Sequence, residues 1–421
     1  MTSTAAPRLS RTVNRSAVLQ TLRLSGPLSQ SELAGRLALS LPTVMRTVEE
    51  LRQECLIQAL GTVPSEGGRP RTMLALNHAA HAVVAVDLGG SKMHGAVLDL
   101  AGQVQHEIRL EYARGDHLHA LDRLYDLVDG LLAAPRPPDQ RVRGIGIGAP
   151  GIVRNPEGVV EWAPSLEWRQ LPLKQLLSDR FGLPVFVEND VNLAALGELD
   201  YGAGRGADSI VCIAIGTGIG AGIVIRGSIY TGAHQIAGEI GYFLPGLRFL
   251  PGSSAVQTEQ AVVDAIPAGF GALETVASGA GIAARASRRR SLAAVQNGGD
   301  GTIGDEPLTT EQVFTAARAG ERWAQEVIDE TVDYLSLAVA NICALLDPEV
   351  VVLGGGIARS ADLLIEPILC RLRGVLPRAP RLVASPLDRL AGVMGAVTLV
   401  LNATAGHSPA HGASGDGATR R

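Results

Sequence analysis

Two polar side chains at the end of an apolar segment carry the clearest chemistry in this chain. Residues 184–187 are apolar and run into Glu188-Asn189-Asp190, so a buried strand would deliver Asn189 and Asp190 to the space beyond its end. An aspartate there can accept the proton of a substrate hydroxyl as that hydroxyl attacks a phosphoryl group. An aspartate that caps a following helix over residues 192–198 would look the same in sequence. The spacing leaves both roles open.

Three glycine-rich segments supply candidate phosphate and nucleoside contacts. They are Asp87-Leu88-Gly89-Gly90-Ser91-Lys92, Gly216-Thr217-Gly218-Ile219-Gly220 and Gly354-Gly355-Gly356, and each follows an apolar run. Because glycine has no side chain, backbone N–H groups in such turns can approach an anion closely. We expect the first two turns to clamp the phosphates of one nucleotide, Asp87 to hold magnesium through water, and the third to face a nucleoside. Tight hairpins also need glycine, so a single turn is weak evidence.

The elements around these turns repeat. Apolar strands are expected over residues 83–86, 96–100, 103–110 and 144–148, with a helical stripe over 118–127, and strands are expected again over 210–215, 222–225 and 350–353. The order of apolar strand, glycine turn and apolar strand therefore occurs twice. This duplication predicts an α/β fold with two similar lobes that face each other.

The first eighty residues have a different pattern. Ser29 and Glu32 form a capping-box spacing, and Ser40 with Pro42 opens a third helix. Val44, Val48 and Leu51 would form its buried face, which leaves Thr43, Arg46 and Thr47 facing outward. Three such helices predict a helix-turn-helix whose last helix enters the major groove of double-stranded DNA. A plain three-helix bundle with a solvated face is the alternative.

A wing is expected to follow these helices. Residues 57–62 and 71–77 read as two strands, with Gly67-Gly68-Arg69-Pro70-Arg71 between them. Arg69 and Arg71 would suit a narrow A·T minor groove, where the negative potential is greatest. A flexible charged linker is the competing interpretation.

Composition is consistent with a DNA-binding unit joined to an acidic body. The net charge is −5, but residues 1–80 hold nine arginines, no lysine and five glutamates, a net of +4 that leaves −9 for the rest. We expect no signal peptide. We also expect no membrane span, because the apolar run 210–225 is short and glycine-rich. The protein is therefore expected to be cytoplasmic. The four cysteines are expected to be buried. Residues 285–306 are expected to form a loop in which the arginine run 288–290 is solvated. Residues 403–421 are expected to be disordered.

Together these residues resemble the ROK family (repressors, open reading frames and kinases) over about residues 14–402. The resemblance implies an actin-like, ribonuclease-H-type duplicated fold over 81–402 behind a winged helix-turn-helix in 1–80. It makes 87–92 and 216–222 the two phosphate loops, 354–356 the adenosine loop, and Asn189-Asp190 the sugar-binding and catalytic-base pair. Residues 232–241 are similar to the family signature, and Glu239 and Glu274 match its sugar contacts.

The chain departs from the family pattern at its zinc site. Tyr242 stands where the family has a histidine that binds sugar and zinc. We expect Tyr242 to contact the sugar as well, because its side chain can hydrogen-bond to a sugar or stack on a sugar face. No cysteine lies between residues 243 and 271, and Ala272 replaces the last zinc cysteine. A tetrahedral zinc site needs four ligands, so zinc is not expected.

These features predict a transcriptional regulator, usually a repressor, of carbohydrate metabolism. Its kinase-like body would sense a sugar or sugar derivative, and a homodimer or homotetramer would bind a paired operator. The alternative is an active Mg-ATP-dependent hexose or aminosugar kinase with a fused DNA-binding unit and Asp190 as base. A body that binds nothing is disfavoured, because buried unpaired carboxylates are costly.

Overall fold

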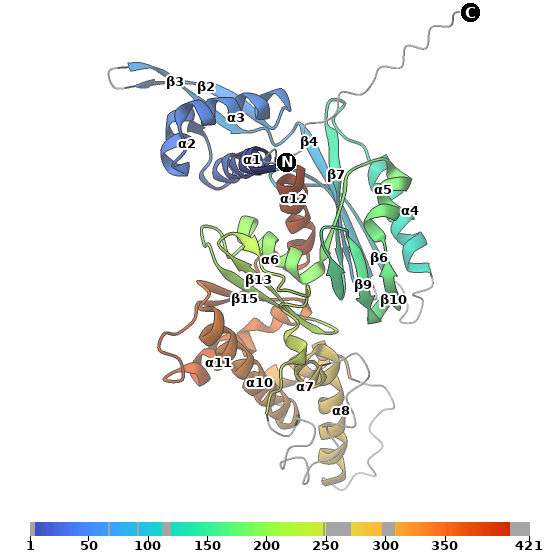
Figure 1. Ribbon diagram of the computed structural model, residues 1–421. Coiled ribbons are helices and arrows are strands. Elements are labelled where there is room, and N and C mark those ends of the chain that lie inside the picture. The colour runs from blue at the N-terminus through green and yellow to red at the C-terminus, as the bar shows by residue number, and fades with distance from the viewer. Residues whose placement is uncertain are drawn as a thin grey trace, which may run out of the picture.

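A computed structural model describes residues 5–65, 68–90, 92–111, 119–246, 249, 271–296 and 308–404. Figure 1 shows an N-terminal unit with a projecting hairpin, and below it a body made of two lobes. We call residues 5–76 the winged unit, the part built on β4–β11 the first lobe, and the part built on β12–β16 the second lobe. No helix among the described ranges is both long and apolar enough to cross a membrane.

The winged unit contains three helices and a three-stranded sheet. The helices are α1 (Ala5–Ser25), α2 (Gln30–Leu37) and α3 (Leu41–Gln53), and the strands β1 (Leu28–Ser29), β2 (Ile57–Ser65) and β3 (Gly68–Leu76) are ordered β1-β3-β2. The predicted capping box is present: the Ser29 backbone N–H donates to Glu32 over 2.8 Å, and the Glu32 N–H donates to the Ser29 hydroxyl over 3.3 Å. The Ser40 cap is present as well.

The wing is longer than predicted. Its strands begin pairing at Ser65 and Gly68 and continue to Ile57 and Leu76, so residues 68–70 form strand rather than the expected link between the two strands. Two irregularities in register, between Ala59 and Gly61 and between Val63 and Ser65, interrupt the ladder. The hairpin is therefore a projecting β-ribbon, as Figure 1 shows.

The first lobe has a five-stranded sheet in the order β11-β7-β4-β5-β6. Its strands are β4 (His81–Leu88), β5 (Lys92–Asp99), β6 (Val104–Glu111), β7 (Arg141–Ala149) and β11 (Val185–Asn189), and its helices are α4 (Ala120–Ala133) and α5 (Leu173–Phe181). A small antiparallel sheet, β8 (Ile152–Arg154), β9 (Val159–Ala163) and β10 (Trp168–Leu171), stands beside it, with the short helix η2 (Pro164–Leu166).

The second lobe repeats this plan with the order β14-β13-β12-β15-β16. Its strands are β12 (Ile210–Ile215), β13 (Ile219–Ile225), β14 (Ser228–Ile229), β15 (Val350–Gly354) and β16 (Leu382–Ala384). Its helices are η3 (Ile240–Tyr242), α7 (Ala272–Ala277), α8 (Gly279–Gln296), α9 (Thr310–Arg318), α10 (Arg322–Leu346), η6 (Gly356–Leu363), α11 (Ile365–Leu372) and η7 (Asp388–Leu390). In both lobes the first strand pairs antiparallel with the second and parallel with the fourth. The predicted duplication is confirmed.

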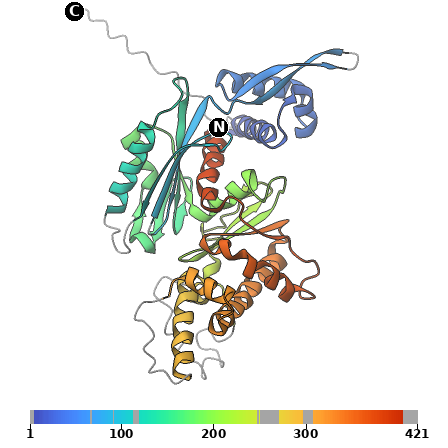
Figure 2. The same ribbon diagram turned by 180° about the vertical axis from the view of Figure 1, so that it is seen from behind.

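The lobes exchange their last helices. Helix α6 (Asp190–Tyr201) leaves the first lobe and packs on β12 and β13, whereas α12 (Ala391–Thr404) leaves the second lobe and packs on β4 and β7. The two helices cross in close contact: a Cβ on Gly395 would lie 1.8 Å from the Leu193 carbonyl oxygen, and one on Gly197 would lie 2.1 Å from that of Ala391. Figure 2 shows α12, in red, running from the winged unit to the junction of the lobes.

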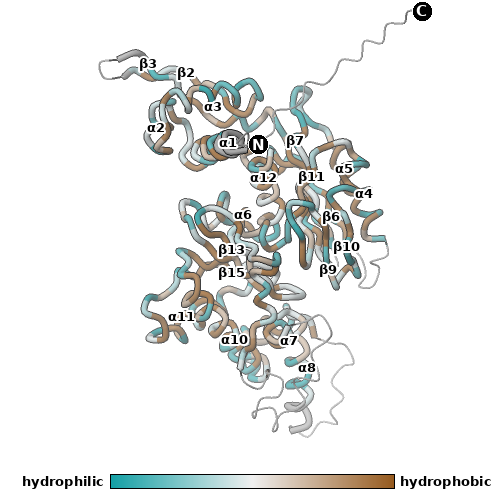
Figure 3. The backbone as a smooth tube through the Cα atoms, in the orientation of Figure 1, coloured by the Kyte–Doolittle hydropathy of each residue, from teal (hydrophilic) through white to brown (hydrophobic). Residues whose placement is uncertain are grey.

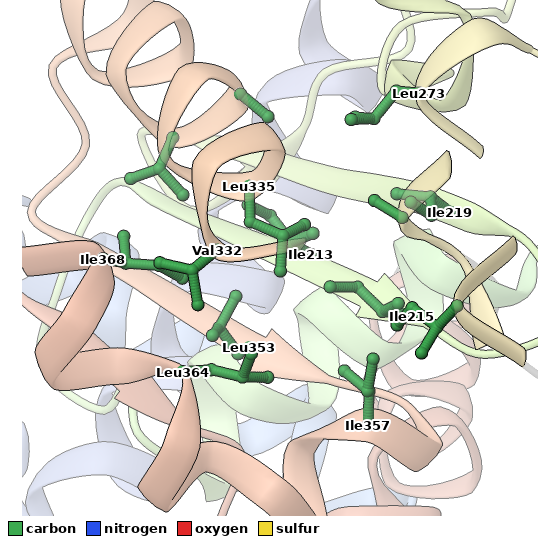
Figure 4. Close-up of a cluster of buried hydrophobic side chains, with 14 of the residues drawn as sticks. Ile213, Ile215, Ile219, Leu273, Val332, Leu335, Leu353, Ile357, Leu364 and Ile368 are labelled. Atoms are coloured by element: carbon green, nitrogen blue, oxygen red, sulfur yellow. The ribbon is translucent and has the colours of Figure 1, made fainter. Parts of the chain in front are cut away.

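The core of the second lobe explains its helices. Figure 3 shows hydrophobic residues along β13 and β15. In Figure 4, Ile213 and Leu353 from neighbouring strands meet Val332 and Leu335 from α10 and Ile368 from α11. All of these side chains are almost completely buried, so α10 and α11 cover one face of this sheet.

The loop predicted over residues 285–306 is wrong for its first half. Residues 285–296 continue α8, and Arg285 pairs with Glu330 over 2.7 Å while Arg289 pairs with Glu326 over 2.7 Å. These partners lie on α10 and hold the arginine-rich segment against it; only Arg288 of the 288–290 run is exposed. Residues 297–306 lie outside the described ranges.

Two further predictions need correction. Cys55 and Cys370 are exposed and Cys343 is half-buried, so only Cys212 matches the expected buried cysteine. The tail was predicted from residue 403, but Ala403 and Thr404 complete α12. Residues 405–421 lie outside the described part of the chain.

Candidate ligand site and DNA-binding face

The structure separates the roles of Asn189 and Asp190. Asn189 caps α6: its Oδ1 accepts hydrogen bonds from the backbone N–H of Val191 over 3.0 Å and of Asn192 over 3.1 Å. Its Nδ2 donates to the carbonyl of Gly151 over 3.0 Å. The capping role that sequence could not assign is thus filled by Asn189. Asp190 is the first residue of α6, and its Oδ1 accepts from the Val191 N–H over 2.9 Å.

Carboxylates from both lobes gather around Asp190. Burial and the nearby carboxylates of Asp87 and Glu239 raise the pKa of Asp190 to about 8. Burial also raises the pKa of Asp87 and Glu239, and the Glu274 carboxylate raises that of Glu239 further. A negative charge on Asp190 is therefore disfavoured by Asp87 and Glu239. Hydroxyl donors stabilise such carboxylates, and a polyhydroxy ligand supplies them.

Glu274 braces the second glycine turn. Its Oε1 accepts from the Ile219 N–H over 3.0 Å and its Oε2 from the Gly271 N–H over 3.3 Å. A Cβ on Gly218 would lie 2.0 Å from Oε1, so only glycine allows this contact. Gly216 and Thr217, at the tip of the turn, are exposed.

The first turn is a tight hairpin. The Gly89 N–H donates to the Lys92 carbonyl over 2.9 Å, and a Cβ on Gly90 would lie 2.7 Å from Cβ of Ser165. Lys92 is exposed, and Ser91 lies outside the described residues. Asp87, at the end of β4, faces the start of α12: a Cβ on Gly392 would lie 3.1 Å from an Asp87 carboxylate oxygen.

The second and third glycine segments lie side by side. Strands β12 and β15 are paired, with Ala214 opposite Gly354, so the turns that follow them leave the same sheet edge. Gly355 has φ +76°, and a Cβ there would lie 2.4 Å from the Ile215 carbonyl oxygen. Gly355 and Gly356 are exposed, whereas Gly354 is buried. The backbone is therefore accessible at two of the three glycines.

Tyr242 lies close to the carboxylates of the second lobe. It is 48% exposed, and burial together with the charges of Glu239 and Glu274 raises the pKa of its hydroxyl. Among the described residues no group of three or more histidine, cysteine, aspartate or glutamate side chains could hold a metal ion. Most of the segment where the family places its zinc ligands lies outside those residues, so the zinc prediction stays untested.

Glu188 is a buried acid to which the sequence assigned no role. Glu188 accepts from Asn192 Nδ2 over 3.0 Å, from the Asn189 N–H over 2.9 Å and from Asn155 Nδ2 over 2.8 Å. It therefore ties the loop after β8 to the start of α6. An acid at the end of an apolar strand was the only signal in the sequence.

Helix α3 presents a narrower polar face than predicted. Arg46 is exposed, and Thr43 is half-buried with its hydroxyl 2.7 Å from that of Ser40. Thr47 is only 3% exposed, so its predicted outward position is wrong. It lies three residues after Val44 and so falls on the buried stripe. Met45, an unassigned neighbour of Arg46, is 49% exposed.

The wing carries Arg71 on its exposed surface. Arg71 pairs with Val63 across β2 and β3, and both side chains are exposed. Arg69 belongs to β3, but its side chain is outside the described set. The ribbon and α3 thus offer exposed arginines from one compact unit, as the helix-turn-helix prediction requires.

Comparison with known proteins agrees with both parts. Residues 83–403 match the model of the ROK family, and residues 12–57 match that of a winged helix-turn-helix DNA-binding segment. The chain is 36% identical to a glucokinase of Halalkalibacterium halodurans over 68% of this chain and 83% of that protein. It is 28% identical to a putative xylose repressor of Caldicellulosiruptor sp. over 94% of this chain and 96% of that protein.

Among solved structures, a ROK family transcriptional regulator described as a homolog of the E. coli MLC protein aligns with a TM-score of 0.74 and 26% identity. The alignment covers 94% of this chain and 97% of that one, so it includes the winged unit as well as the body. The predicted family and actin-like fold with an N-terminal winged helix-turn-helix are confirmed. This chain belongs to the ROK family.

Proposed function

We propose that this protein is a DNA-binding transcriptional repressor whose ROK body binds a sugar or sugar derivative. The observation that carries the proposal is the joining of a winged helix-turn-helix to a body in which Asp190 lies near the carboxylates of Asp87 and Glu239. Relatives of this full-length architecture include the putative xylose repressor and the MLC homolog. The sugar changes the affinity for DNA by favouring one arrangement of the winged unit and the body.

Residues 1–80 form the DNA-binding domain in this proposal, and 81–402 the sensor. Arg46, Thr43 and the wing arginines Arg69 and Arg71 contact a double-stranded operator. The sugar lies against the residues at the start of α6 and the carboxylates of the second lobe: Asn189, Asp190, Glu239, Tyr242 and Glu274. Paired half-sites require at least a homodimer.

The test begins with DNA duplexes enriched from a randomised pool by the full-length protein. Affinity for the enriched duplex is then measured with D-xylose, D-glucose or no sugar. We expect Arg46→Ala to weaken binding strongly, and Arg52→Ala, an exposed arginine at the end of the same helix, to weaken it less. We expect one sugar to lower the affinity in wild type and to lose this effect in Asp190→Asn. Enrichment of no duplex contradicts the DNA-binding part, and an unchanged affinity with both sugars contradicts the response to these sugars.

Sugar kinase activity is the second candidate. The exposed glycine turns favour this activity, and so does Asp190, because Asn189 rather than Asp190 caps α6. Asp87 and the phosphate loops would hold Mg-ATP. The measurement is ADP release from Mg-ATP across hexoses and aminosugars. Turnover that disappears in Asp190→Asn supports a bifunctional kinase, and turnover no higher than that variant excludes one for those sugars.

A further inference from the structure

We propose that Arg23 is the coupling residue between the candidate ligand site around Asp190 and the DNA-binding unit. It lies near the end of α1 and is inserted where α6 and α12 lie side by side. The inference rests on the proposed function for its ligand, but the contacts that carry it are independent of which sugar binds.

The Arg23 side chain contacts both helices. Its Nη2 lies 2.5 Å from a carboxylate oxygen of Asp200 on α6, and its Nη1 donates to the Thr398 hydroxyl on α12 over 3.1 Å. The Thr398 hydroxyl in turn donates to Asp200, and the guanidinium lies over the Tyr201 ring, 5.5 Å from its centroid. The Arg23 and Asp200 side chains are 7% and 1% exposed, so this is a buried link rather than a solvated surface pair.

The other ends of the same helices reach the candidate ligand site. Helix α6 begins at Asp190, about 15 Å from Asp200 at 1.5 Å per residue, and α12 begins beside Asp87 through Gly392. Each helix packs on the sheet of the lobe it does not follow. A change in lobe separation therefore moves α6 against α12, and Arg23, in the winged unit, bonds to both.

The link is incompletely paired in this arrangement. Among the described residues, Arg23 Nε and Asp200 Oδ1 have no hydrogen-bond partner. A bidentate arginine–carboxylate pair uses two nitrogens and both oxygens. A shift of α1 against α6 can therefore improve the pairing, which gives the link a second favourable arrangement.

A second contact supports the same helix. Arg143 Nε donates to the Thr404 hydroxyl at the end of α12 over 2.7 Å, and its Nη2 lies 3.3 Å from Glu54 at the end of α3. Helix α12 is thereby connected to α1 through Thr398 and to the DNA-facing α3 through Thr404. The movement of one helix reaches two elements of the winged unit.

The experiment measures the position of the winged unit directly. Spin labels are attached to the exposed Cys55, beside α3, and Cys370, on the second lobe, in a Cys343→Ala background. Their distance distribution is recorded by double electron–electron resonance for wild type, Arg23→Gln and Arg23→Gln/Asp200→Asn. The double variant avoids leaving an unpaired buried carboxylate. The matched control is Arg180→Gln, because Arg180 also pairs with an aspartate, Asp129, and lies over a tyrosine, Tyr125, but only within the first lobe.

Without sugar, we expect a broadened distance distribution in both Arg23 variants and the wild-type distribution in Arg180→Gln. Unbroadened distributions in both Arg23 variants overturn the proposal. With D-xylose or D-glucose bound, we expect the distance distribution to shift in wild type and to stay unchanged in Arg23→Gln. Isothermal titration calorimetry should confirm that the sugar still binds to this variant. A wild-type shift in a folded Arg23→Gln also overturns it. If neither sugar binds wild type, the proposed response to these sugars fails, and the sugar-free comparison still decides the role of Arg23.

Discussion

At the scale of single residues, the candidate ligand site depends on acids held in an environment that disfavours their charge. Asp190 is the clearest case, because its pKa is raised to about 8 by burial and by Asp87 and Glu239. The folded protein therefore retains a proton that the unfolded chain releases near pH 4. Between these values the folded state binds more protons than the unfolded state, so the free energy of unfolding falls as pH rises.

Asp190→Asn removes this dependence. We expect the ligand-free variant to be more stable than wild type at pH 8 and to lose most of that advantage at pH 5, with a slope of at most about 1.4 kcal/mol per pH unit. Urea unfolding at the two pH values measures it. Asp179→Asn, at an exposed position on α5, is the control, and an advantage for Asp190→Asn that does not depend on pH contradicts the prediction.

Glu188 acts on the site through Asn189 and Asn155. Glu188→Gln replaces an acceptor of three hydrogen bonds by an amide that places a donor against donors. We expect a loss of about 1–3 kcal/mol in the free energy of unfolding and a weaker sugar affinity, because the start of α6 and the loop after β8 are no longer tied together. Urea unfolding and calorimetric sugar titration are compared with Glu157→Gln, an exposed glutamate of the neighbouring loop. Equal behaviour of the two variants would rule out this role.

At the scale of elements, the crossing of α6 and α12 sets the geometry of the whole body. Gly395→Ala would place a Cβ 1.8 Å from a backbone oxygen of α6, which cannot be relieved by turning a side chain. We expect a large loss of stability, more than about 3 kcal/mol. Gly35→Ala on α2 meets nothing within 4 Å and should stabilise the chain by about 0.5–1 kcal/mol. Thermal unfolding of both variants tests the contrast, and similar melting temperatures would refute it.

The elements also show what sequence could and could not predict. Strands beside glycine turns and capped helices follow from local patterns, and β4, β12 and α2 lie where those patterns placed them. Residues 285–296 were mistaken for a loop because their arginines are stabilised by Glu326 and Glu330, which lie far along the chain. Thr47 was predicted to face outward because threonine is polar, although its spacing of three residues from Val44 places it on the buried face of α3. The contact of Glu274 with the second turn joins residues 55 apart, and no local pattern encodes it.

At the scale of the whole molecule, charge is divided between the parts. The first eighty residues carry +4 and the remainder −9, so the winged unit attracts DNA while the body repels it. Binding by arginines that neutralise phosphates releases counterions, and the affinity then falls with salt. The proposed sugar binding, through hydrogen bonds, releases no counterions and has no such salt dependence.

We therefore expect the logarithm of the DNA association constant to fall linearly with the logarithm of salt concentration, while sugar affinity stays nearly constant. Arg71→Gln on the wing should reduce the magnitude of this slope by about 0.9, the contribution of one phosphate contact. Arg180→Gln, whose arginine is exposed on the body and lies far from the winged unit in sequence, should leave the slope unchanged. Fluorescence anisotropy with the enriched duplex between low and physiological salt measures both. A slope that is the same in wild type and Arg71→Gln would remove Arg71 from the phosphate contacts of the DNA interface.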